Sequence, residues 1–222
     1  MPRTGGAYAM YGIYGVEDGE VVYEEGQGGY IGRMVSVKIS KTNNSDNDWN
    51  CDNSVGETDD AFGGGQIALE VGEISVDTAE AVLGVEVVPL TGNDAIAGVT
   101  DEGACKIIHK ANPQLPYIGV GTVMEERIQG VTYYVPIIVN KVKLQPPDTE
   151  IATRKPNKNI DWGNVTVNGT IFKDDAEDPN WKTECSPLTT LAQALAFLRA
   201  ILGVPDPSRE EEAEETQSQT SG

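Results

Sequence analysis

The strongest constraint on the fold is an alternation of polar and apolar residues that recurs along residues 115–172. Within residues 164–171, branched apolar residues occupy one side of an extended chain, and threonine and asparagine occupy the other. A repeat of two residues is typical of a half-buried antiparallel strand. The same pattern appears at residues 35–40 and 66–71. The sequence therefore predicts a mainly β fold of the sandwich or barrel type.

Residues 131–144 predict a longer strand that is apolar on both sides and so covered on both sides. Gly130 precedes this strand and predicts a hairpin turn. Pro136 lies within it, and proline has no N–H group to donate to a neighbouring strand. We therefore expect Pro136 to lie on an edge strand or at a bulge.

A short helix is predicted at residues 77–83. Asp77 is the expected N-cap, and Glu80 three residues later fits a capping box. Gly84 supplies the left-handed residue that ends a helix.

A second helix is predicted from a single apolar stripe near the C-terminal end of the sequence. The stripe consists of Leu191, Leu195, Leu198 and Leu202, with Ala194 and Ile201 beside it. Thr189 or Thr190 can cap its start and Gly203 ends it. We expect the stripe to pack on a sheet.

Three segments differ in composition from the strand-rich region, and they set the expected organisation. Residues 1–30 are rich in glycine and tyrosine and predict an N-terminal arm with little core of its own. Residues 42–65 predict a long loop or loose hairpin inside a domain of residues 31–203. Residues 204–222 are acidic and predict a disordered tail.

The formal net charge of −19 excludes most ways of binding nucleic acid. An acidic chain repels phosphate and lacks the cationic patches that release counterions on binding. A net negative charge suits a surface past which nucleic acid moves without binding. No run approaches the roughly 20 apolar residues that cross a bilayer, and no secretory signal is apparent. We expect a cytosolic protein with no membrane partner.

One acidic segment resembles a calcium-binding loop only in part. Asp46, Asp48, Asn50 and Glu57 match the oxygen-ligand positions of an EF-hand. Cys51 stands where that loop requires glycine, and the flanking residues do not predict helices. We therefore expect a solvated acidic loop and no metal site.

No catalytic site is predicted. His109 is the only histidine, and no Gly-X-Ser-X-Gly elbow accompanies it. Cys105 lies four residues before His109, where the two would face each other on a helix, but no third group is evident to orient them. Three widely spaced cysteines fit neither a disulfide framework nor a zinc site, so free thiols are expected. The glycine clusters match no nucleotide-binding fingerprint, and no cofactor is expected.

Four segments together carry a resemblance to a known family. They are CDNSVGETDDAFGGGQIALEVGEISVDTAEAVLG, LPYIGVGTVM, GVTYYVPIIVNKVKLQPPDTEIATRK and WGNVTVNGTIF. In this order, across about residues 35–182 and including the Gln-Pro-Pro turn at residues 145–147, the chain resembles the phi13-type major tail proteins of long-tailed bacteriophages. The first thirty residues and the acidic tail have no match in that pattern.

The resemblance implies a tail tube fold, in which a β-sandwich flanked by a helix forms six-fold rings that stack into a hollow tube. It implies a structural virion protein of the phage tail, assembled in the host cytoplasm, and no catalytic residues. The implied partners are further copies of the chain, the tape measure protein, the tail terminator and the distal tail protein. DNA is expected only in passage through the lumen.

The same architecture implies that the arm and the long loop bridge neighbouring subunits or rings. The candidate interface residues are the large aromatic side chains in these segments: Tyr8, Tyr11, Tyr14, Trp49 and Phe62. The alternative function is a β-sandwich adhesin, which would stay monomeric or form a small closed oligomer and cluster its aromatic residues for a ligand. A hydrolase, the third class, would lose its activity on substitution of one carboxylate.

Overall fold

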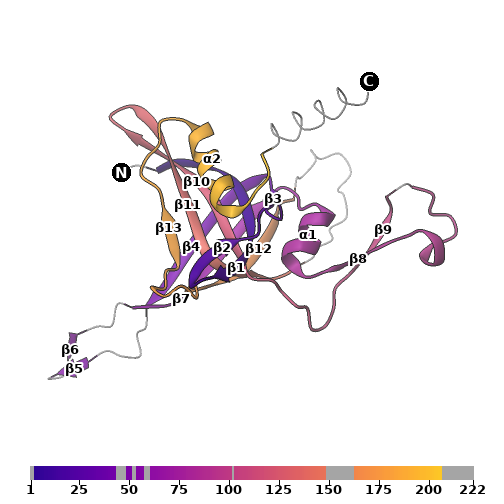
Figure 1. The fold of residues 1–222 in the computed structure, drawn as a ribbon, viewed down its shortest axis with the longest axis horizontal. Coiled ribbons are helices and arrows are strands. Elements are labelled where there is room, and N and C mark those ends of the chain that lie inside the picture. Colours follow the sequence, from indigo (N-terminus) through magenta and orange to yellow (C-terminus); the bar gives the residue numbers. More distant parts are fainter. Residues whose placement is uncertain are drawn as a thin grey trace, which may run out of the picture. The chain divides into compact units, whose positions relative to one another are not determined.

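The computed structural model describes residues 3–43, 49–51, 54–57, 61–101, 103–148 and 163–206. The fold is mainly β, as the alternation predicts, and the described residues include two α-helices (Figure 1). All strand pairs of known register are antiparallel. The arrangement as a sandwich or barrel stays a prediction.

The elements follow one another in a simple order along the chain. They are β1 (Arg3–Glu17), β2 (Glu20–Tyr23), β3 (Gly29–Gly32), β4 (Met34–Asn43), β5 (Trp49–Cys51), β6 (Ser54–Glu57), β7 (Phe62–Val71), α1 (Val76–Leu83), β8 (Glu86–Pro89), the 3-10 turn η2 (Gly92–Asp94), β9 (Cys105–Ile108), β10 (Ile118–Ile128), β11 (Val131–Leu144), β12 (Val165–Phe172), β13 (Lys182–Glu184) and α2 (Leu191–Leu202).

The described residues form two compact units. Unit 1 draws on Met1–Tyr30, Ile118–Val142 and Phe172–Gly222, and unit 2 on Ile31–Tyr117 and Lys143–Ile171. Neither unit coincides with the expected domain of residues 31–203, because residues from both ends of the chain join its middle strands in unit 1.

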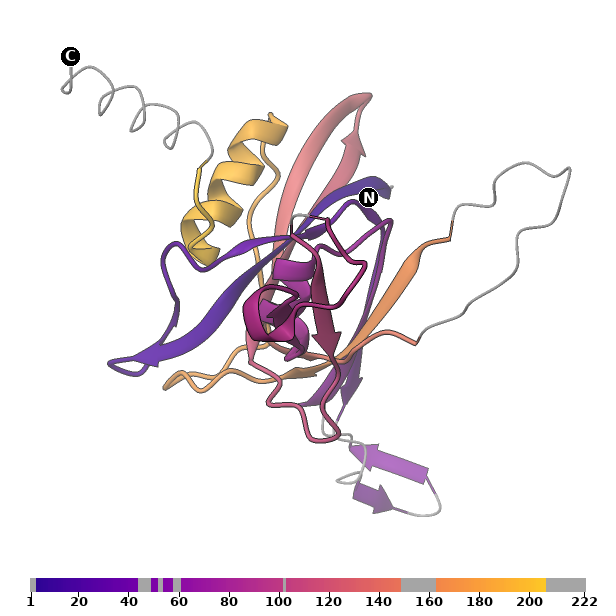
Figure 2. The ribbon, with the colours of Figure 1, turned by 90° about the vertical axis from the view of Figure 1, so that its right-hand side faces the viewer.

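Unit 1 is built on a sheet with the order β2-β1-β10-β11, and β13 also pairs with β11. β10 and β11 form a long hairpin that rises beside α2 in Figure 2. Its two turn residues, Gln129 and Gly130, both have positive φ, at 51° and 87°. This is the backbone that a tight two-residue hairpin requires, and the turn predicted at Gly130 is confirmed.

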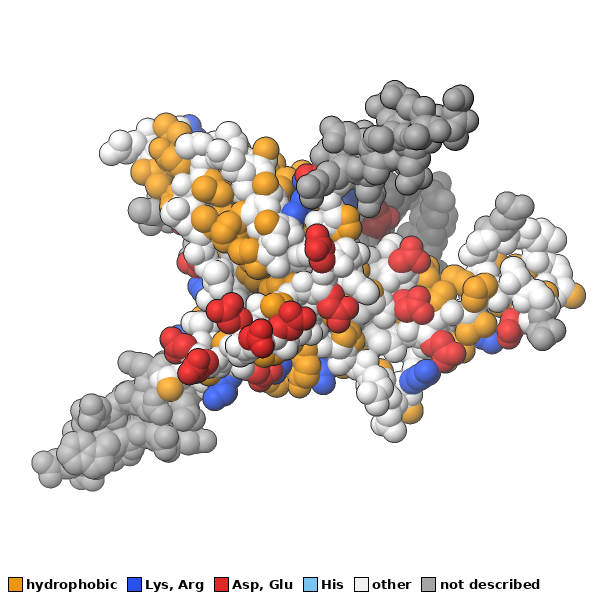
Figure 3. Space-filling model, in the orientation of Figure 1, with side chains coloured by type: hydrophobic (Ala, Val, Ile, Leu, Met, Phe, Trp, Pro, Cys, Tyr) orange, Lys and Arg blue, Asp and Glu red, His pale blue; other side chains and the backbone are white. Residues whose placement is uncertain are grey.

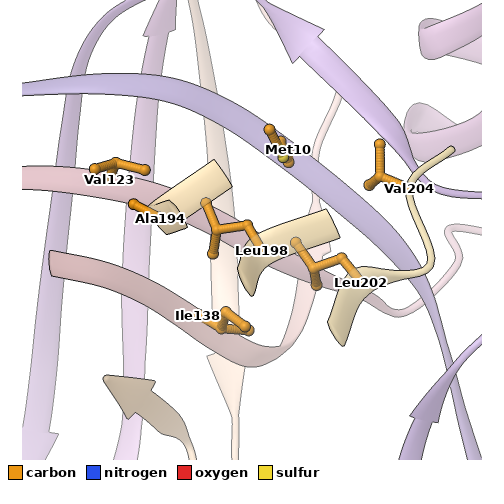
Figure 4. Close-up of a cluster of buried hydrophobic side chains, with 7 residues drawn as sticks. All are labelled: Met10, Val123, Ile138, Ala194, Leu198, Leu202 and Val204. Atoms are coloured by element: carbon orange, nitrogen blue, oxygen red, sulfur yellow. The ribbon is translucent and has the colours of Figure 1, made fainter. Parts of the chain in front are cut away.

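Helix α2 packs its apolar stripe on this sheet, as predicted. Leu198, Leu202 and Ala194 point toward side chains of β1, β10 and β11 (Figure 4). The buried hydrophobic cluster between helix and sheet consists of Met10, Val123, Ile138, Ala194, Leu198, Leu202 and Val204. Thr190 caps the helix by accepting a hydrogen bond from the Gln193 N–H, and Gly203 ends it at φ 64°. Each fully buried leucine contributes about 1.5–3 kcal/mol to folding.

The helix lies so close to the strands that glycine is required beneath it. A Cβ on Gly12 of β1 would lie 2.4 Å from the Leu202 carbonyl oxygen. A Cβ on Gly121 of β10 would lie 2.6 Å from the Leu202 side chain. The short separation lets the leucines pack directly against the strands.

The expectation of an N-terminal arm at residues 1–30 is wrong. Strand β1 pairs with β10 from Arg3 to Ile13 and with β2 from Tyr14 to Glu17. Ala9 and Met10 are fully buried. Glycine suggested flexibility in the sequence, but here it permits close packing, as Gly12 shows.

The edge position expected for Pro136 is found on one side of β11 only. Pro136 pairs in regular register with Val123 of β10, and its carbonyl accepts a hydrogen bond from the Cys185 N–H at 3.0 Å. On that side of β11, β13 ends at Glu184 and a single bridge follows at Leu188. The missing N–H of the proline therefore falls where the neighbouring strand has already ended.

A buried polar cluster fixes the loop that precedes β13. The Asn140 side-chain amide donates to Asp174 at 2.8 Å, and the Asn180 N–H donates to the same carboxylate at 2.8 Å. The Tyr23 hydroxyl donates to the Asn140 carbonyl at 2.9 Å, and burial raises the pKa of Tyr23 above its usual value. The cluster satisfies polar groups that burial would otherwise make costly.

Unit 2 contains the antiparallel strands β12, β7 and β4, in that order. Ile67, Leu69 and Val71 of β7 are buried, as are Val167 and Ile171 of β12. The predicted alternation is confirmed for these two strands. On β4 it is weaker, since Val35 is 52% exposed.

Helix α1 forms where a short helix was predicted and ends at Gly84, with φ 60°. The expected cap is wrong by two residues: Ser75, not Asp77, accepts the hydrogen bond from the Thr78 N–H. The loose hairpin expected at residues 42–65 is present as β5 paired with β6. The strands β4 and β7 extend into that range, to Asn43 and from Phe62.

Replacing Leu198 with alanine tests the role of α2. Leu198 is fully buried, so the lost contacts and the cavity should lower the free energy of unfolding by about 2–5 kcal/mol. Urea denaturation followed by circular dichroism measures this change. Ile201→Ala on the same helix is the control, because Ile201 is 37% exposed and should cost much less. Equal losses for the two variants would contradict the packing described.

Candidate assembly surfaces

Tyr8 is the most unusual of the five predicted interface residues. It is an extra residue in β1 between the pairs Ala7–Val123 and Ala9–Thr122, so it forms a β-bulge. Its φ is 62°, which is rare for a residue other than glycine, asparagine or aspartate. The bulge directs the exposed ring toward Tyr30, with the ring centroids 6.2 Å apart. The Tyr30 hydroxyl in turn accepts a hydrogen bond from Arg199 at 2.9 Å.

Tyr11 and Tyr14 are held inside unit 1. Tyr11 is 7% exposed and its ring lies against Gly29, where a Cβ would be 3.1 Å from the ring. The Tyr14 hydroxyl donates to the Asp175 carboxylate at 3.2 Å and accepts from the Asp175 N–H at 2.9 Å. Lys141 lies 5.1 Å from the centre of the Tyr14 ring. Both tyrosines therefore stabilise the unit in the single chain.

The five residues come from different parts of the chain. Tyr8, Tyr11 and Tyr14 lie on β1 of unit 1, whereas Phe62 is a half-buried residue at the start of β7 in unit 2. The Trp49 side chain lies outside the described part of the structure, as do Asp46 and Asp48 of the acidic loop. The interface role of these residues stays a prediction.

The outward face of the β12-β7-β4 sheet is polar and nearly uncharged. Its side chains are Ser36, Lys38, Ser40, Gln66, Ala68, Glu70, Thr166, Asn168 and Thr170. Glu70 accepts hydrogen bonds from the Ser36 hydroxyl at 3.0 Å and the Asn164 amide at 2.9 Å. One lysine and one glutamate balance each other on this face, although acids outnumber bases by 35 to 16 in the chain.

A groove of about 220 Å³ lies on this face. Three amide side chains line it, those of Gln66, Gln145 and Asn168, together with Lys38 and Thr170. Such groups donate and accept hydrogen bonds with neutral polar partners or with water.

Strand β4 leaves an open edge in unit 2. Nine of its ten residues pair with β7, all except Val35, and it pairs with no other described strand. An edge of this length carries a row of unpaired N–H and C=O groups. Irregularities in register at Met34–Ser36 and Thr42–Asn43, together with exposed Lys38 and Lys41, limit indiscriminate pairing.

The sequence reasoning missed the β8–β9 hairpin. Glu86–Pro89 pairs with Cys105–Ile108 as a separate two-stranded sheet. Cys105 and His109 therefore do not share a helix, because Cys105 begins a strand. The detectable signal was the apolar alternation on either side of the glycine-containing residues 92–103.

The described residues offer little for chemistry. Among them, no three His, Cys, Asp or Glu side chains are grouped to hold a metal ion. Cys105 and Cys185 are free thiols. No helix among these residues has the length and apolar character needed to span a membrane.

No protein-family model matches the chain, and no curated protein matches it.

The Asp175 carboxylate in unit 1 contacts both Lys141 and Tyr14. The hydrogen bond from Lys141 is the main reason that the pKa of Asp175 lies below its usual value. Burial raises the pKa of Tyr14, whose hydroxyl contacts the same carboxylate. The ionised form of Asp175 is thus the form that the folded chain stabilises.

This arrangement predicts a pH dependence of stability. The unfolded-state pKa of an aspartate is about 3.9, and the folded-state value of Asp175 is lower, so its contribution is present above about pH 4. The contribution is lost as the pH falls through the folded-state pKa. Because Asp175 is exposed, it should amount to less than about 1 kcal/mol.

Urea unfolding of the wild type and of Asp175→Asn between about pH 2 and pH 6 measures the effect. The variant should lack this acid-sensitive component. Asp178→Asn, a change in the same exposed loop, is the matched control and should follow the wild type. Identical pH profiles for all three proteins would contradict the role given to the Lys141 contact.

Proposed function

We propose that this chain is a structural subunit that assembles with its own copies into a tube, as a major tail tube protein of a long-tailed phage. In this proposal, hexameric rings stack to form a conduit for DNA during ejection. The tape measure protein, tail terminator and distal tail protein are the further partners. The resemblance of four ordered segments to phi13-type major tail proteins supports it, together with two features of the structure.

The open edge of β4 is the observation that carries the proposal. Strand β4 pairs with β7 on one side only among the described strands, and the backbone groups on its other side form a template for a strand from another copy. Sheets shared around a ring remove such edges altogether. A closed barrel of about 16–18 strands already encloses an aqueous channel, so several subunits contributing strands from one sheet suffice for a lumen.

The polar face of the same sheet suits the lining of that lumen. Serine, threonine, asparagine and glutamine side chains keep the surface hydrated without attracting phosphate. An acidic lining was expected from the charge of the whole chain, but this face carries only Lys38 and Glu70. The weak affinity for DNA then follows from the lack of excess cations on the face, since counterion release has no source there.

The adhesin alternative draws support from a different observation. The groove lined by Gln66, Gln145 and Asn168 offers neutral hydrogen-bonding groups of the kind that bind a polar ligand. Ile67 and Ala68 also line it, but no aromatic residue does, whereas most ligand pockets are lined mainly by apolar and aromatic side chains. The tube is therefore the function that the sheet supports better.

Negative-stain electron microscopy of the purified chain over a concentration series tests the proposal. Rings or hollow tubes that become more abundant with concentration are the expected result. Particles that remain monomeric at every concentration, with or without an added tail initiation complex, would favour the binding module instead.

Placing a lysine on the β4 edge tests the sheet pairing directly. Val35→Lys adds an exposed charge of the kind that natural edge strands use against pairing. The concentration needed for assembly should rise about tenfold or more, which corresponds to about 1.4 kcal/mol. Val131→Lys is the control, because Val131 is 54% exposed at the tip of the β10–β11 hairpin. Equal assembly of the two variants would contradict the role of β4.

A further inference from the structure

The β1–β2 hairpin extends beyond the part of β1 that is paired with β10. That pairing ends at Ile13, and from Tyr14 onward β1 pairs with β2. The hairpin closes in a tight turn at Asp18 and Gly19, with φ of 50° and 81°. A two-stranded hairpin is at best marginally stable in water by itself. Residues 14–23, which we call the hairpin flap, therefore depend on contacts outside their own pairing.

The base of the hairpin flap is anchored in unit 1. The Tyr23 ring covers Gly119 of β10, where a Cβ would lie 2.3 Å from the ring, and the Tyr23 hydroxyl donates to the Asn140 carbonyl. Just beyond the flap, the Gly26 N–H donates to the Gly203 carbonyl at 2.9 Å. These contacts fix the end of the flap that adjoins the sheet.

The loop of residues 173–181 holds the rest of the flap. The Glu177 N–H donates to the Gly19 carbonyl in the turn at 3.1 Å. The Asp175 N–H donates to the Tyr14 hydroxyl at 2.9 Å, and this hydroxyl donates to the Asp175 carboxylate. The flap and the loop lie side by side in both ribbon views (Figure 2). These hydrogen bonds join the two segments near the tip of the flap.

The two joined segments carry charge of the same sign. Residues 17–25 contain five exposed acids and no base. The loop exposes Asp175, Glu177 and Asp178, against the single base Lys173. Figure 3 shows acidic side chains gathered over this part of unit 1. Because like charges repel, the contact between flap and loop costs electrostatic free energy.

Lys141 of β11 supplies a positive charge to both segments. Its ammonium group contacts the Asp175 carboxylate and lies 5.1 Å from the centre of the Tyr14 ring. The Lys141 side chain is only 11% exposed, whereas that of Asp175 is 57% exposed. Salt screens partly buried charge pairs less than it screens exposed charges. The attraction of Lys141 should therefore persist at a salt concentration that removes the repulsion between exposed acids.

We propose that Lys141 and the 173–181 loop form a latch that holds the hairpin flap closed against the repulsion of its acids. When the latch is weakened, the flap opens locally about its anchored base. Opening breaks the hydrogen bonds at Tyr14 and Gly19 and exposes the Lys141 ammonium group. Added salt closes the flap, because it screens the exposed acids. The inference goes beyond the proposed function and concerns a single chain, whether or not its copies assemble.

Amide hydrogen exchange of the full-length chain, followed by NMR, measures the latch. The Asp175 and Glu177 N–H groups report opening directly, since both donate across the contact, and the Gly26 N–H reports the base. Lys141→Met should speed exchange of the first two amides about threefold or more and leave Gly26 unchanged. Lys143→Met is the matched control, because Lys143 lies two residues further along β11, over a tyrosine ring of unit 2.

Tyr14→Phe tests the same latch without removing the lysine, and it decides the matter if Lys141→Met does not fold. The variant keeps the ring and loses the hydroxyl that joins flap to loop. Exchange of the Glu177 amide should become faster, although its own acceptor is unchanged. The effect should be smaller in the Lys141→Met background, because residues of one network act together.

A salt series tests the repulsion. In the wild type, raising NaCl from about 20 mM to about 500 mM should slow exchange of the Glu177 amide relative to the amide at the base. A variant with Glu17→Gln and Glu20→Gln should exchange slowly at both concentrations. A variant with Glu24→Gln and Glu25→Gln, the same change of charge at the base, is the control and should keep the response to salt.

Three results would overturn the inference. The first is equal exchange in Lys141→Met and Lys143→Met, and the second is faster exchange of the Glu177 amide at high salt. The third is acceleration of the Gly26 amide together with the two latch amides, because unit 1 would then open as a whole. None of them bears on tube formation, which electron microscopy tests separately.

Discussion

The packing of α2 against the β1–β10 pair is the interaction on which unit 1 depends. Leu198 and Leu202 fill the space between helix and sheet, and glycine at positions 12 and 121 brings the two layers together. Without this cover, the apolar side of the sheet would face water. The helix also positions Arg199, which donates to Tyr30 and so fixes the neighbour of the bulged Tyr8.

The sequence predicted correctly those elements whose position follows from the periodicity of their apolar residues alone. The strands β11 and β12 and helix α2 were predicted because their apolar periods match the surfaces that they bury. Unit 1's first strand was not, because glycine-rich sequence indicates flexibility until the partner that requires close approach is known. The same limit applies to Pro136, whose tolerance depends on where β13 ends.

The candidate surfaces were less accessible to sequence reasoning. Aromatic residues suggested an interface, yet Tyr11 is buried and Tyr14 is bound to Asp175, and alternation alone does not distinguish these roles. The open edge of β4, the balanced polar face and the isolated β8–β9 hairpin arise from strand order. Strand order depends on long-range pairing, which local patterns do not encode.

The composition of unit 1 has a consequence for synthesis on the ribosome. Its sheet begins with β1 at the start of the chain, yet the leucines that cover it come from residues 191–202, after every strand has been made. Residues near the N-terminus must therefore wait for the whole intervening chain before their core closes. The side of the sheet that α2 covers therefore stays open to solvent or to a chaperone until residues 191–202 have left the ribosome.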